Sequence, residues 1–411
     1  MSLCFVCGNE LSMKTLVLVF LMPLSLASQD NQVKWFDIHA QATTITQAHG
    51  PFNAPYSGKN SLRPFTETDT SVTTTLSLRL THQNTELGFD GEVAGGNGFS
   101  GVAGIAAFPN GEITKIGKPA PTPYVARLFL KQQVSHFTWI AGKMSAEDFF
   151  DNNAYSHEPR TQFMNWSIMY NGAWDYPADT RGYTVGALLE FAFGPFRLRA
   201  GSFLEPVWAN GPKLDGHFAA SRGDVWEWQY QYAKGGVVRV MRFMNHGNMG
   251  TYRRADQDIV VTRKPGTAKY GFGLNVEQRI TGDVGVFGRL GWNDGKTESW
   301  AFTEIDRTAS SGLSLRGSRW HRQDDVFGAA VAVNGISGDH RAYLARGGYG
   351  FMIGDGMLAR PDPEELFEAY YAWRVQKVVT ISADYQRIVN PAYNQDRGPI
   401  TVFSLRLHVE H

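Results

Sequence analysis

The segment from Met144 to Thr180 concentrates residue types that recognise polar, uncharged solutes. It reads MSAEDFFDNNAYSHEPRTQFMNWSIMYNGAWDYPADT and mixes aromatic, amide and charged side chains. Aromatic rings pack on the C–H face of a pyranose, while Asn, Asp and Arg satisfy its hydroxyls. We therefore predict substrate-binding or constriction residues in and just after this segment. They are Arg160, Trp166, Trp174, Asp175, Tyr176, Asp179 and Arg181.

The aromatic residues of this segment have a second interpretation. Trp166, Trp174 and Tyr176 could instead anchor the segment to the rest of the fold or to a neighbouring subunit, because large rings dominate packing and interfaces alike. Composition alone does not separate the two interpretations.

Signatures of catalysis, metal binding and cofactor binding are absent from the sequence. The eleven histidines form no H-E-x-x-H motif, and no G-x-S-x-G motif organises a nucleophile. The glycine-rich stretch from Gly91 to Glu112 lacks the Lys-Ser/Thr of a phosphate loop. Cys4 and Cys7 have C-x-x-C spacing, but no second cysteine pair accompanies them. We predict a protein that is not an enzyme and holds no metal or cofactor.

The charge balance argues against a nucleic-acid partner. The chain has 39 basic and 39 acidic residues, so its net charge is zero. Nucleic-acid binding relies on a basic surface, and no basic run stands out here.

The N-terminus has the pattern of a secretory signal. Met13 and Lys14 open a charged region, TLVLVFLMPLSL follows as an apolar region, and Ser25-Leu26-Ala27 offers a cleavage site. The apolar run is too short to span a bilayer. We predict that residues 1–27 are an N-terminal extension plus signal peptide with a true start at Met13. Residues 28–411 then form an exported, cysteine-free chain.

Strict alternation of apolar and polar residues recurs along the exported part. In LFEAYYAWRV, Phe367, Tyr371 and Trp373 share one face, while Glu368 and Arg374 share the other. Sixteen segments of this kind are predicted as strands, at about 35–47, 71–82, 84–93, 123–133, 135–143, 181–193, 195–204, 225–233, 236–246, 269–281, 283–293, 324–336, 338–352, 366–376, 377–389 and 399–410.

The connections between these segments alternate between short and long. The predicted tight turns include Gly194-Pro195, Lys234-Gly235-Gly236, Thr281-Gly282-Asp283 and Gly338-Asp339. Outer-membrane barrels have this arrangement, with short periplasmic turns and long external loops. We predict a single all-β domain over residues 28–411, a sixteen-stranded antiparallel transmembrane β-barrel in contact with outer-membrane lipid. Residues 144–180 would fold inward as its constriction loop.

Charged residues of both signs fall on the strand faces that would line the lumen. They are Arg79, Arg127, Glu190, Arg197, Arg199, Glu277, Arg279, Glu368, Arg374 and Arg406. Opposed charges create a transverse field that suits polar, uncharged, hydroxyl-rich solutes. The alternative is a wet wall of salt bridges with no role in selectivity.

Several longer motifs resemble the carbohydrate-selective porin family of the OprB type. They include GFSGVAGIAAFPNGE from Gly98, GAWDYPADTRGY from Gly172 and DYQRIVNPAYNQDRGP from Asp384. The resemblance implies an outer-membrane barrel that passes glucose and other small sugars by diffusion, with homotrimers common among such porins. It places Arg160, Trp174, Asp175, Asp179 and Arg181 in the loop motif and Arg397 in the terminal one.

Two alternatives to this function remain open. One is a general porin, or a porin for polysaccharide or organic acids. The other is a structural or enzymatic barrel whose lumen is plugged.

Overall fold

The computed structural model describes residues 35–113, 120–232 and 235–411. The predicted extension and signal peptide, residues 1–27 with Met13 and both cysteines, lie outside the described residues. Lys234 of one predicted turn also lies outside them.

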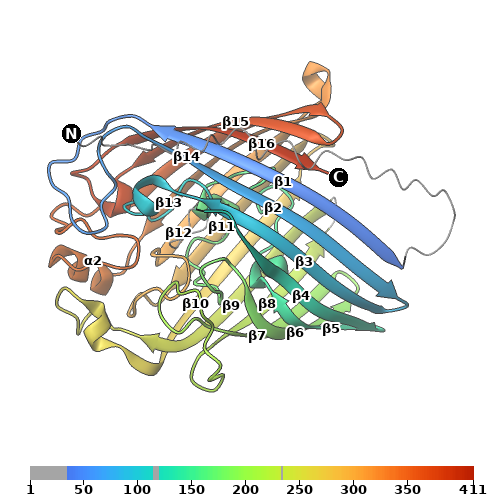
Figure 1. The fold of residues 1–411 in the computed structure, drawn as a ribbon, viewed down its shortest axis with the longest axis horizontal. Coiled ribbons are helices and arrows are strands. Elements are labelled where there is room, and N and C mark those ends of the chain that lie inside the picture. The colour runs from blue at the N-terminus through green and yellow to red at the C-terminus, as the bar shows by residue number, and fades with distance from the viewer. Residues whose placement is uncertain (1–34, 114–119, 233–234) are drawn as a thin grey trace, which may run out of the picture. The chain divides into compact units, whose positions relative to one another are not determined.

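The described part of the chain forms a closed antiparallel barrel of sixteen strands, as predicted (Figure 1). The strands are β1 (Phe36–His49), β2 (Glu67–His82), β3 (Thr85–Gly96), β4 (Thr122–Val134), β5 (Phe137–Met144), β6 (Thr184–Phe193), β7 (Phe196–Leu204), β8 (Arg222–Tyr232), β9 (Gly236–Met249), β10 (Lys264–Arg279), β11 (Val284–Asn293), β12 (Arg307–Gly317), β13 (Arg322–Gly335), β14 (Glu364–Gln376), β15 (Val379–Val389) and β16 (Ile400–Glu410). Each strand pairs with its neighbours in sequence, and β1 closes the barrel against β16, with Thr44 opposite Leu407. Closure leaves no unpaired strand edge.

Alternating residues give the barrel wall an apolar outer face and a polar inner face. On β16, Leu405 is 58% exposed on the outside, while the neighbouring Arg406 is 0% exposed on the inside. A water-soluble barrel has the opposite assignment, with its apolar side chains enclosed. An outer face of this kind is suited to contact with lipid.

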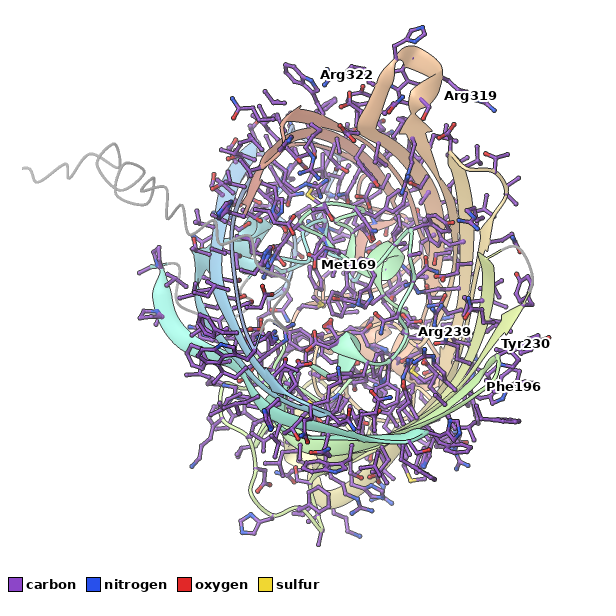
Figure 2. All side chains as sticks on the ribbon, turned by 90° about the vertical axis from the view of Figure 1, so that its right-hand side faces the viewer. Met169, Phe196, Tyr230, Arg239, Arg319 and Arg322 are labelled. Atoms are coloured by element: carbon purple, nitrogen blue, oxygen red, sulfur yellow. The ribbon has the colours of Figure 1, made fainter. Side chains whose placement is uncertain are left out.

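Aromatic side chains form a band on the outer face of the barrel near the short turns. The ring centroids of Phe193 and Phe196 lie 5.6 Å apart, and those of Phe196 and Tyr230 lie 4.9 Å apart. Figure 2 shows Phe196 and Tyr230 on the outer side of the wall. Membrane barrels carry such aromatic girdles at the level of the lipid headgroups.

One predicted strand is wrong and one strand of the barrel was not predicted, so the two errors cancel in the count. Residues 338–352, predicted as a strand, instead contain helix α2 (Gly338–Ala345) and the loop after it. The Ser337 side chain caps this helix by accepting from the N–H of His340. The predicted turn at Gly338-Asp339 is therefore the first turn of α2.

The strand that the sequence analysis missed is β12. It contains Ser310, Ser311 and Gly312, and these small residues give almost no contrast between the two faces. A short 3₁₀ turn, η5 (Ser318–Trp320), joins β12 to β13. The predicted turn at Gly194-Pro195 does connect β6 to β7, and the one at Thr281-Gly282-Asp283 lies between β10 and β11.

The long connections gather at one end of the barrel and the short turns at the other (Figure 1). We number the long connections as loops 1 to 8 in chain order. Loop 2 (97–121) includes η1 (Phe99–Gly101), and loop 3 (145–183) includes η2 (Ala146–Asp148) and helix α1 (Trp166–Met169). Figure 2 shows Met169 of loop 3 inside the ring of strands.

The other helical turns lie in the external loops. They are η4 (Ile259–Thr262) in loop 5 and η6 (Pro391–Tyr393) in loop 8. Among the described residues, no helix is both long enough and apolar enough to cross a membrane.

Candidate constriction site

Charged side chains of the barrel wall hold the backbone of loop 3 inside the lumen. The carboxylate of Glu368 on β14 accepts from the N–H groups of Met164 at 2.6 Å and Asn165 at 3.0 Å. The Nη1 of Arg406 on β16 donates to the carbonyl oxygen of Pro159 at 2.6 Å. Both residues were predicted to line the lumen. They are fully buried beneath loop 3 instead of facing a channel.

Strands β10 and β11 of the wall make equivalent contacts. Arg289 on β11 donates to the carbonyl oxygens of Ile168 at 2.8 Å and Ser156 at 2.6 Å. Glu277 on β10, another predicted lumen residue, accepts from the N–H of Ala154 at 2.7 Å. Hydrogen bonds to charged groups are stronger than neutral ones. Strands β10, β11, β14 and β16 thus all hold the middle part of loop 3.

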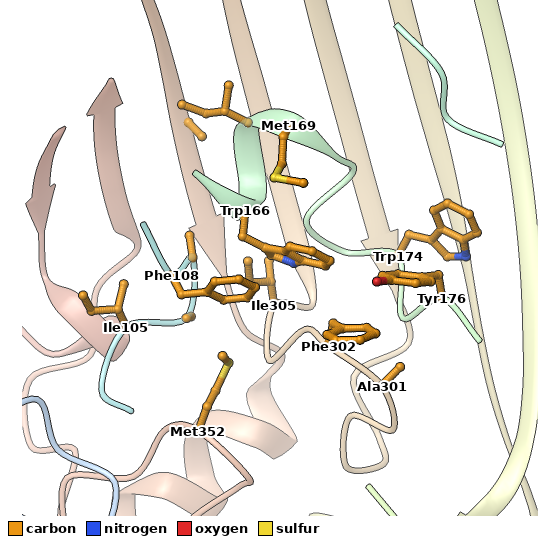
Figure 3. Packing of buried hydrophobic residues seen from close by; sticks show 14 of the residues in the cluster. Ile105, Phe108, Trp166, Met169, Trp174, Tyr176, Ala301, Phe302, Ile305 and Met352 are labelled. Carbon is orange, nitrogen blue, oxygen red and sulfur yellow. The ribbon is translucent and has the colours of Figure 1, made fainter. Parts of the chain in front are cut away.

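A stack of aromatic rings joins three loops in the interior (Figure 3). Trp166 of loop 3 stacks on Phe108 of loop 2, with ring centroids 4.9 Å apart. Tyr176 of loop 3 stacks on Phe302 of loop 6 (294–306), with centroids 4.8 Å apart and planes within 12°. Such pairs add to the stability that burial provides. The stack supports the interpretation in which these aromatics anchor the loop.

Trp174 and Asp175 also serve as anchors in this structure. Trp174 is 1% exposed and contacts Phe150 edge to face. The Asp175 carboxylate accepts from the N–H groups of Trp300 at 2.7 Å and Ala301 at 2.8 Å, and it lies 3.3 Å from Lys269 Nζ. Neither Trp174 nor Asp175 lines the cavity described next.

A polar cavity of about 180 Å³ opens between loop 3, loop 2 and the wall. Its charged lining residues are Arg127, Arg160, Arg181, Glu112, Glu147, Asp148 and Glu158, and its aromatic ones are Trp166, Tyr170, Tyr176, Tyr183 and Phe302. Four of the predicted loop residues therefore meet at this cavity: Arg160, Trp166, Tyr176 and Arg181. Arg127, which was predicted to line the lumen, joins them there.

The guanidinium groups at this cavity face carboxylates on more than one side. Arg160 donates from Nη2 to Glu92 at 3.0 Å and from Nε to Glu112 at 2.7 Å. Arg127 donates from Nε to Asp148 at 2.6 Å and from Nη1 to Asp90 at 3.1 Å. Positive and negative groups are interleaved, so the cavity attracts neither sign of ion strongly.

Arg181 is held differently from the other two arginines. Its guanidinium carbon lies 4.0 Å from the centre of the Tyr124 ring, a cation–π contact. Its buried Nη1 atom has no hydrogen-bond partner among the described residues. Asp179 shapes the chain beside it by accepting from the N–H groups of Arg181 and Tyr183. The Arg181 side chain also lines the cavity.

Two titratable groups of loops 2 and 3 are shifted towards their neutral forms. Burial, reinforced by the nearby positive charge of Arg289, lowers the pKa of His157 to about 4. Burial also raises the pKa of Glu112, although Arg160 opposes the shift. Both groups line the cavity. Desolvation disfavours the charged form of a side chain.

The remaining predicted lumen residues make salt bridges along the wall or lie near its turn end. Arg79 pairs with Asp90 at 2.5 Å, and Glu190 pairs with Arg197 at 3.0 Å and Arg199 at 2.6 Å. Arg279 is exposed at the end of β10, and Arg374 donates to the carbonyl oxygen of Lys377. These contacts fit the alternative of a salt-bridged wall.

Arg397 of the terminal motif is also structural. It is 2% exposed, donates to the carbonyl oxygen of Leu62 at 2.5 Å and lies 3.4 Å from Asp355. It thereby joins loops 1, 7 and 8.

Several cavity residues escaped the sequence analysis. Glu112 lies in the glycine-rich stretch, from which no site residue was predicted, and Tyr170 and Asp148 lie in loop 3 without a distinguishing motif. Phe302 comes from loop 6, far away in the sequence. No signal in the chain links it to loop 3. Among the described residues, no group of three His, Cys, Asp or Glu side chains is placed to hold a metal ion.

A closed barrel with an apolar outer belt and inward-folded loops defines the class of outer-membrane porins. The chain belongs to the family described as "Carbohydrate-selective porin, OprB family", whose model matches residues 59–410. The protein is therefore a channel of the outer membrane that passes carbohydrates, and the predicted family, fold, function and location are confirmed. Family and fold indicate a channel and not an enzyme.

Solved structures with the same fold include an OprB protein and another outer membrane channel. The structure of Pseudomonas putida OprB at high pH has a TM-score of 0.72 and 15% identity, and the match covers 92% of this chain and 94% of that one. The low-pH structure of the same protein has a TM-score of 0.52 and 13% identity over 92% and 93% of the two chains. The outer membrane channel DcaP of Acinetobacter baumannii has a TM-score of 0.58 and 8% identity over 92% and 97%. No curated protein sequence matches the chain.

Proposed function

We propose that small carbohydrates pass the barrel through the cavity between loops 2 and 3, in contact with Arg160, Arg181, Trp166 and Tyr176. The observation that carries this proposal is the meeting of guanidinium groups, carboxylates and aromatic rings at one cavity of about 180 Å³. These are the groups that satisfy sugar hydroxyls and pack against a pyranose ring.

Passage through this site is passive. The loop backbone limits the size of the solute, and the hydroxyls of the sugar exchange water for the charged side chains of the cavity. A channel requires contacts that are favourable enough for entry but weak enough for release. Many shared donors and acceptors, none of them dedicated to one position on the sugar, meet that condition.

The arrangement of charges favours neutral solutes over organic acids. Arg127 and Arg160 each lie between two carboxylates, so neither offers an uncompensated positive charge. The Arg181 guanidinium lines the same cavity, and its N–H groups can donate to sugar hydroxyls. A carboxylate solute would also meet the acidic groups of the same cavity.

The decisive experiment is single-channel conductance of the refolded mature protein in a planar bilayer, with glucose or maltose titrated in. We expect a steady conductance that the sugar lowers saturably. Arg181→Gln and Tyr176→Ala should each raise the half-saturating sugar concentration by about tenfold. This is the loss of affinity expected when one hydrogen bond to a charged group or one aromatic contact is removed. Arg319→Gln, at an exposed turn on β12–β13, removes the same charge outside the cavity and serves as the control.

Other outcomes favour the alternatives. A steady conductance that no sugar changes would favour a general porin. A preference for organic acids would indicate that the arginines alone determine which solutes pass. A folded barrel without conductance would favour a plugged lumen.

A homotrimer is the assembly implied by the family resemblance, and for this chain we propose it only on that ground. Light scattering of the folded protein in detergent, corrected for bound detergent, would distinguish one, two or three copies.

A further inference from the structure

A groove of about 420 Å³ lies on the outer surface of the barrel near the loop end of β12 and β13. Its apolar lining consists of Ala309, Val333, Ile336, Pro361, Pro363 and the ring of Tyr393. Val333 is 45% exposed and faces away from the lumen. The groove is therefore separate from the cavity that loops 2 and 3 enclose.

Two arginines stand at this groove without partners. Arg307 is the first residue of β12, and Arg341 lies on α2. Both are exposed, and the side chain of neither forms a hydrogen bond or ion pair with another described residue. The one acidic residue in the lining, Asp362, accepts a hydrogen bond from Gln395 at 2.7 Å. The groove thus has a net positive rim over an apolar floor.

The groove lies at the level where lipid headgroups meet the barrel. Arg307 is opposite Trp292 in the β11–β12 register, and the rings of Trp292 and Tyr270 lie 5.8 Å apart on the outer face. Aromatic residues in this position mark the membrane interface. Because long loops are external in outer-membrane barrels, this interface belongs to the outer leaflet.

The floor of the groove also has free space at Gly335. A Cβ atom built at this residue would meet no heavy atom within 4 Å. Gly335 pairs with Arg307 across the β12–β13 ladder, and loop 7 begins at the next residue. An acyl chain can therefore approach the backbone of β13 beneath the arginines.

We propose that this groove binds a phosphorylated glycolipid of the outer leaflet. Its phosphate would bridge Arg307 and Arg341, and one acyl chain would lie against Ala309 and Val333. Arginine pairs with phosphate through two parallel N–H···O bonds, and basic pockets on membrane proteins recognise anionic lipid heads in this way. The lipid would also connect α2 of loop 7 to the barrel wall. This proposal is independent of the route that sugars take.

Native mass spectrometry of the refolded protein tests the proposal, with diphosphoryl lipid A as the probe. We expect one retained lipid A on the wild-type protein. The double variant Arg307→Gln/Arg341→Gln should lower its affinity at least about tenfold. Gly335→Phe keeps both arginines but fills the groove, and it should lower retention as well. Arg319→Gln, an exposed arginine at the turn end of the barrel, should bind as the wild type does.

Four results would overturn the proposal, and the first three concern lipid binding. They are equal binding by the double variant, equal binding of lipid A without its phosphates, and equal retention of phosphatidylglycerol. The fourth is a change of oligomeric state in the variants with lipid A binding unchanged. That result would indicate that the groove contacts a second copy of the chain and would contradict the proposal. Heat-modifiable migration on a gel and unchanged sugar block would show that each variant is folded.

Discussion

The carboxylate of Glu368 on the barrel wall accepts a hydrogen bond from the N–H of Met164 in loop 3, with 2.6 Å between Oε1 and nitrogen. The two residues are about 200 positions apart in the chain, and both are buried. Similar carboxylate contacts recur elsewhere: Glu364 accepts from two N–H groups of loop 2, and Asp175 accepts from two of loop 6. Acidic side chains that accept pairs of backbone N–H groups are thus one way in which the interior loops are held.

We expect Glu368→Ala to loosen loop 3. The substitution leaves two buried N–H groups without an acceptor, at a cost of about 2 kcal/mol or more in the free energy of unfolding. Urea unfolding in vesicles measures the loss, and single-channel recordings should show larger current fluctuations. Glu365→Ala, an exposed residue of the same strand, should change the stability by less than about 0.5 kcal/mol. Quiet recordings and unchanged stability in Glu368→Ala would show that loop 3 does not depend on this contact.

We expect acid to destabilise the protein through His157. Its pKa falls from an ordinary 6.5 to about 4 in the folded protein, because burial and Arg289 disfavour the charged ring more than Asp151 and Asp148 favour it. Between pH 6.5 and 4 the unfolded chain then binds more protons than the folded one, so stability decreases as the pH falls through this window. His157→Asn should reduce the difference in unfolding midpoint between pH 7 and pH 4.5. An identical difference in the variant would contradict the assignment.

Glu304 of loop 6 should give a pH dependence of the opposite sign. Its Oε2 accepts from the N–H groups of Met352 and Ile353 in loop 7 (336–363), at 2.8 Å each, and burial raises its pKa from 4.5 to about 7. The folded state therefore holds the extra proton between these values, and stability decreases as the pH rises from 4.5 to 7. Glu304→Gln keeps an oxygen acceptor and does not titrate, so it should flatten this part of the profile. A wild-type slope retained in the variant would assign the effect to another group.

We expect the outward-facing Arg242 to lower the stability of the barrel. It is exposed on β9 between Trp226 and Phe272, and its guanidinium carbon lies 5.8 Å from the centre of the Trp226 ring. A charged residue on the lipid face of a barrel costs up to about 2–4 kcal/mol, depending on its depth. Arg242→Leu should therefore raise the free energy of unfolding in vesicles by about 1–3 kcal/mol. Val240→Leu on the same face is the control. A loss of stability in Arg242→Leu would show that the arginine has a partner in the membrane.

The sequence by itself was sufficient to predict the barrel. Alternation in strands such as β14 and β16 and the succession of short and long connections predicted a sixteen-stranded membrane barrel, because each strand shows one face to lipid and one to the interior. The same reasoning missed β12, where small residues on both faces leave no contrast to read. It mistook α2 for a strand because a helix of eight residues is short enough to mimic partial alternation.

The candidate site was only partly visible in the sequence. Arg160, Trp166, Tyr176 and Arg181 could be selected because they lie close together in one aromatic and charged stretch. Glu112 and Phe302 come from other loops, and they approach loop 3 only because barrel closure encloses loops 2, 3 and 6 in the same space. Trp166 and Trp174 are equivalent in the sequence, yet only Trp166 borders the cavity. Side-chain type is a local property that the sequence contains, whereas the partners of a side chain depend on how distant loops pack, and that only the tertiary structure decides.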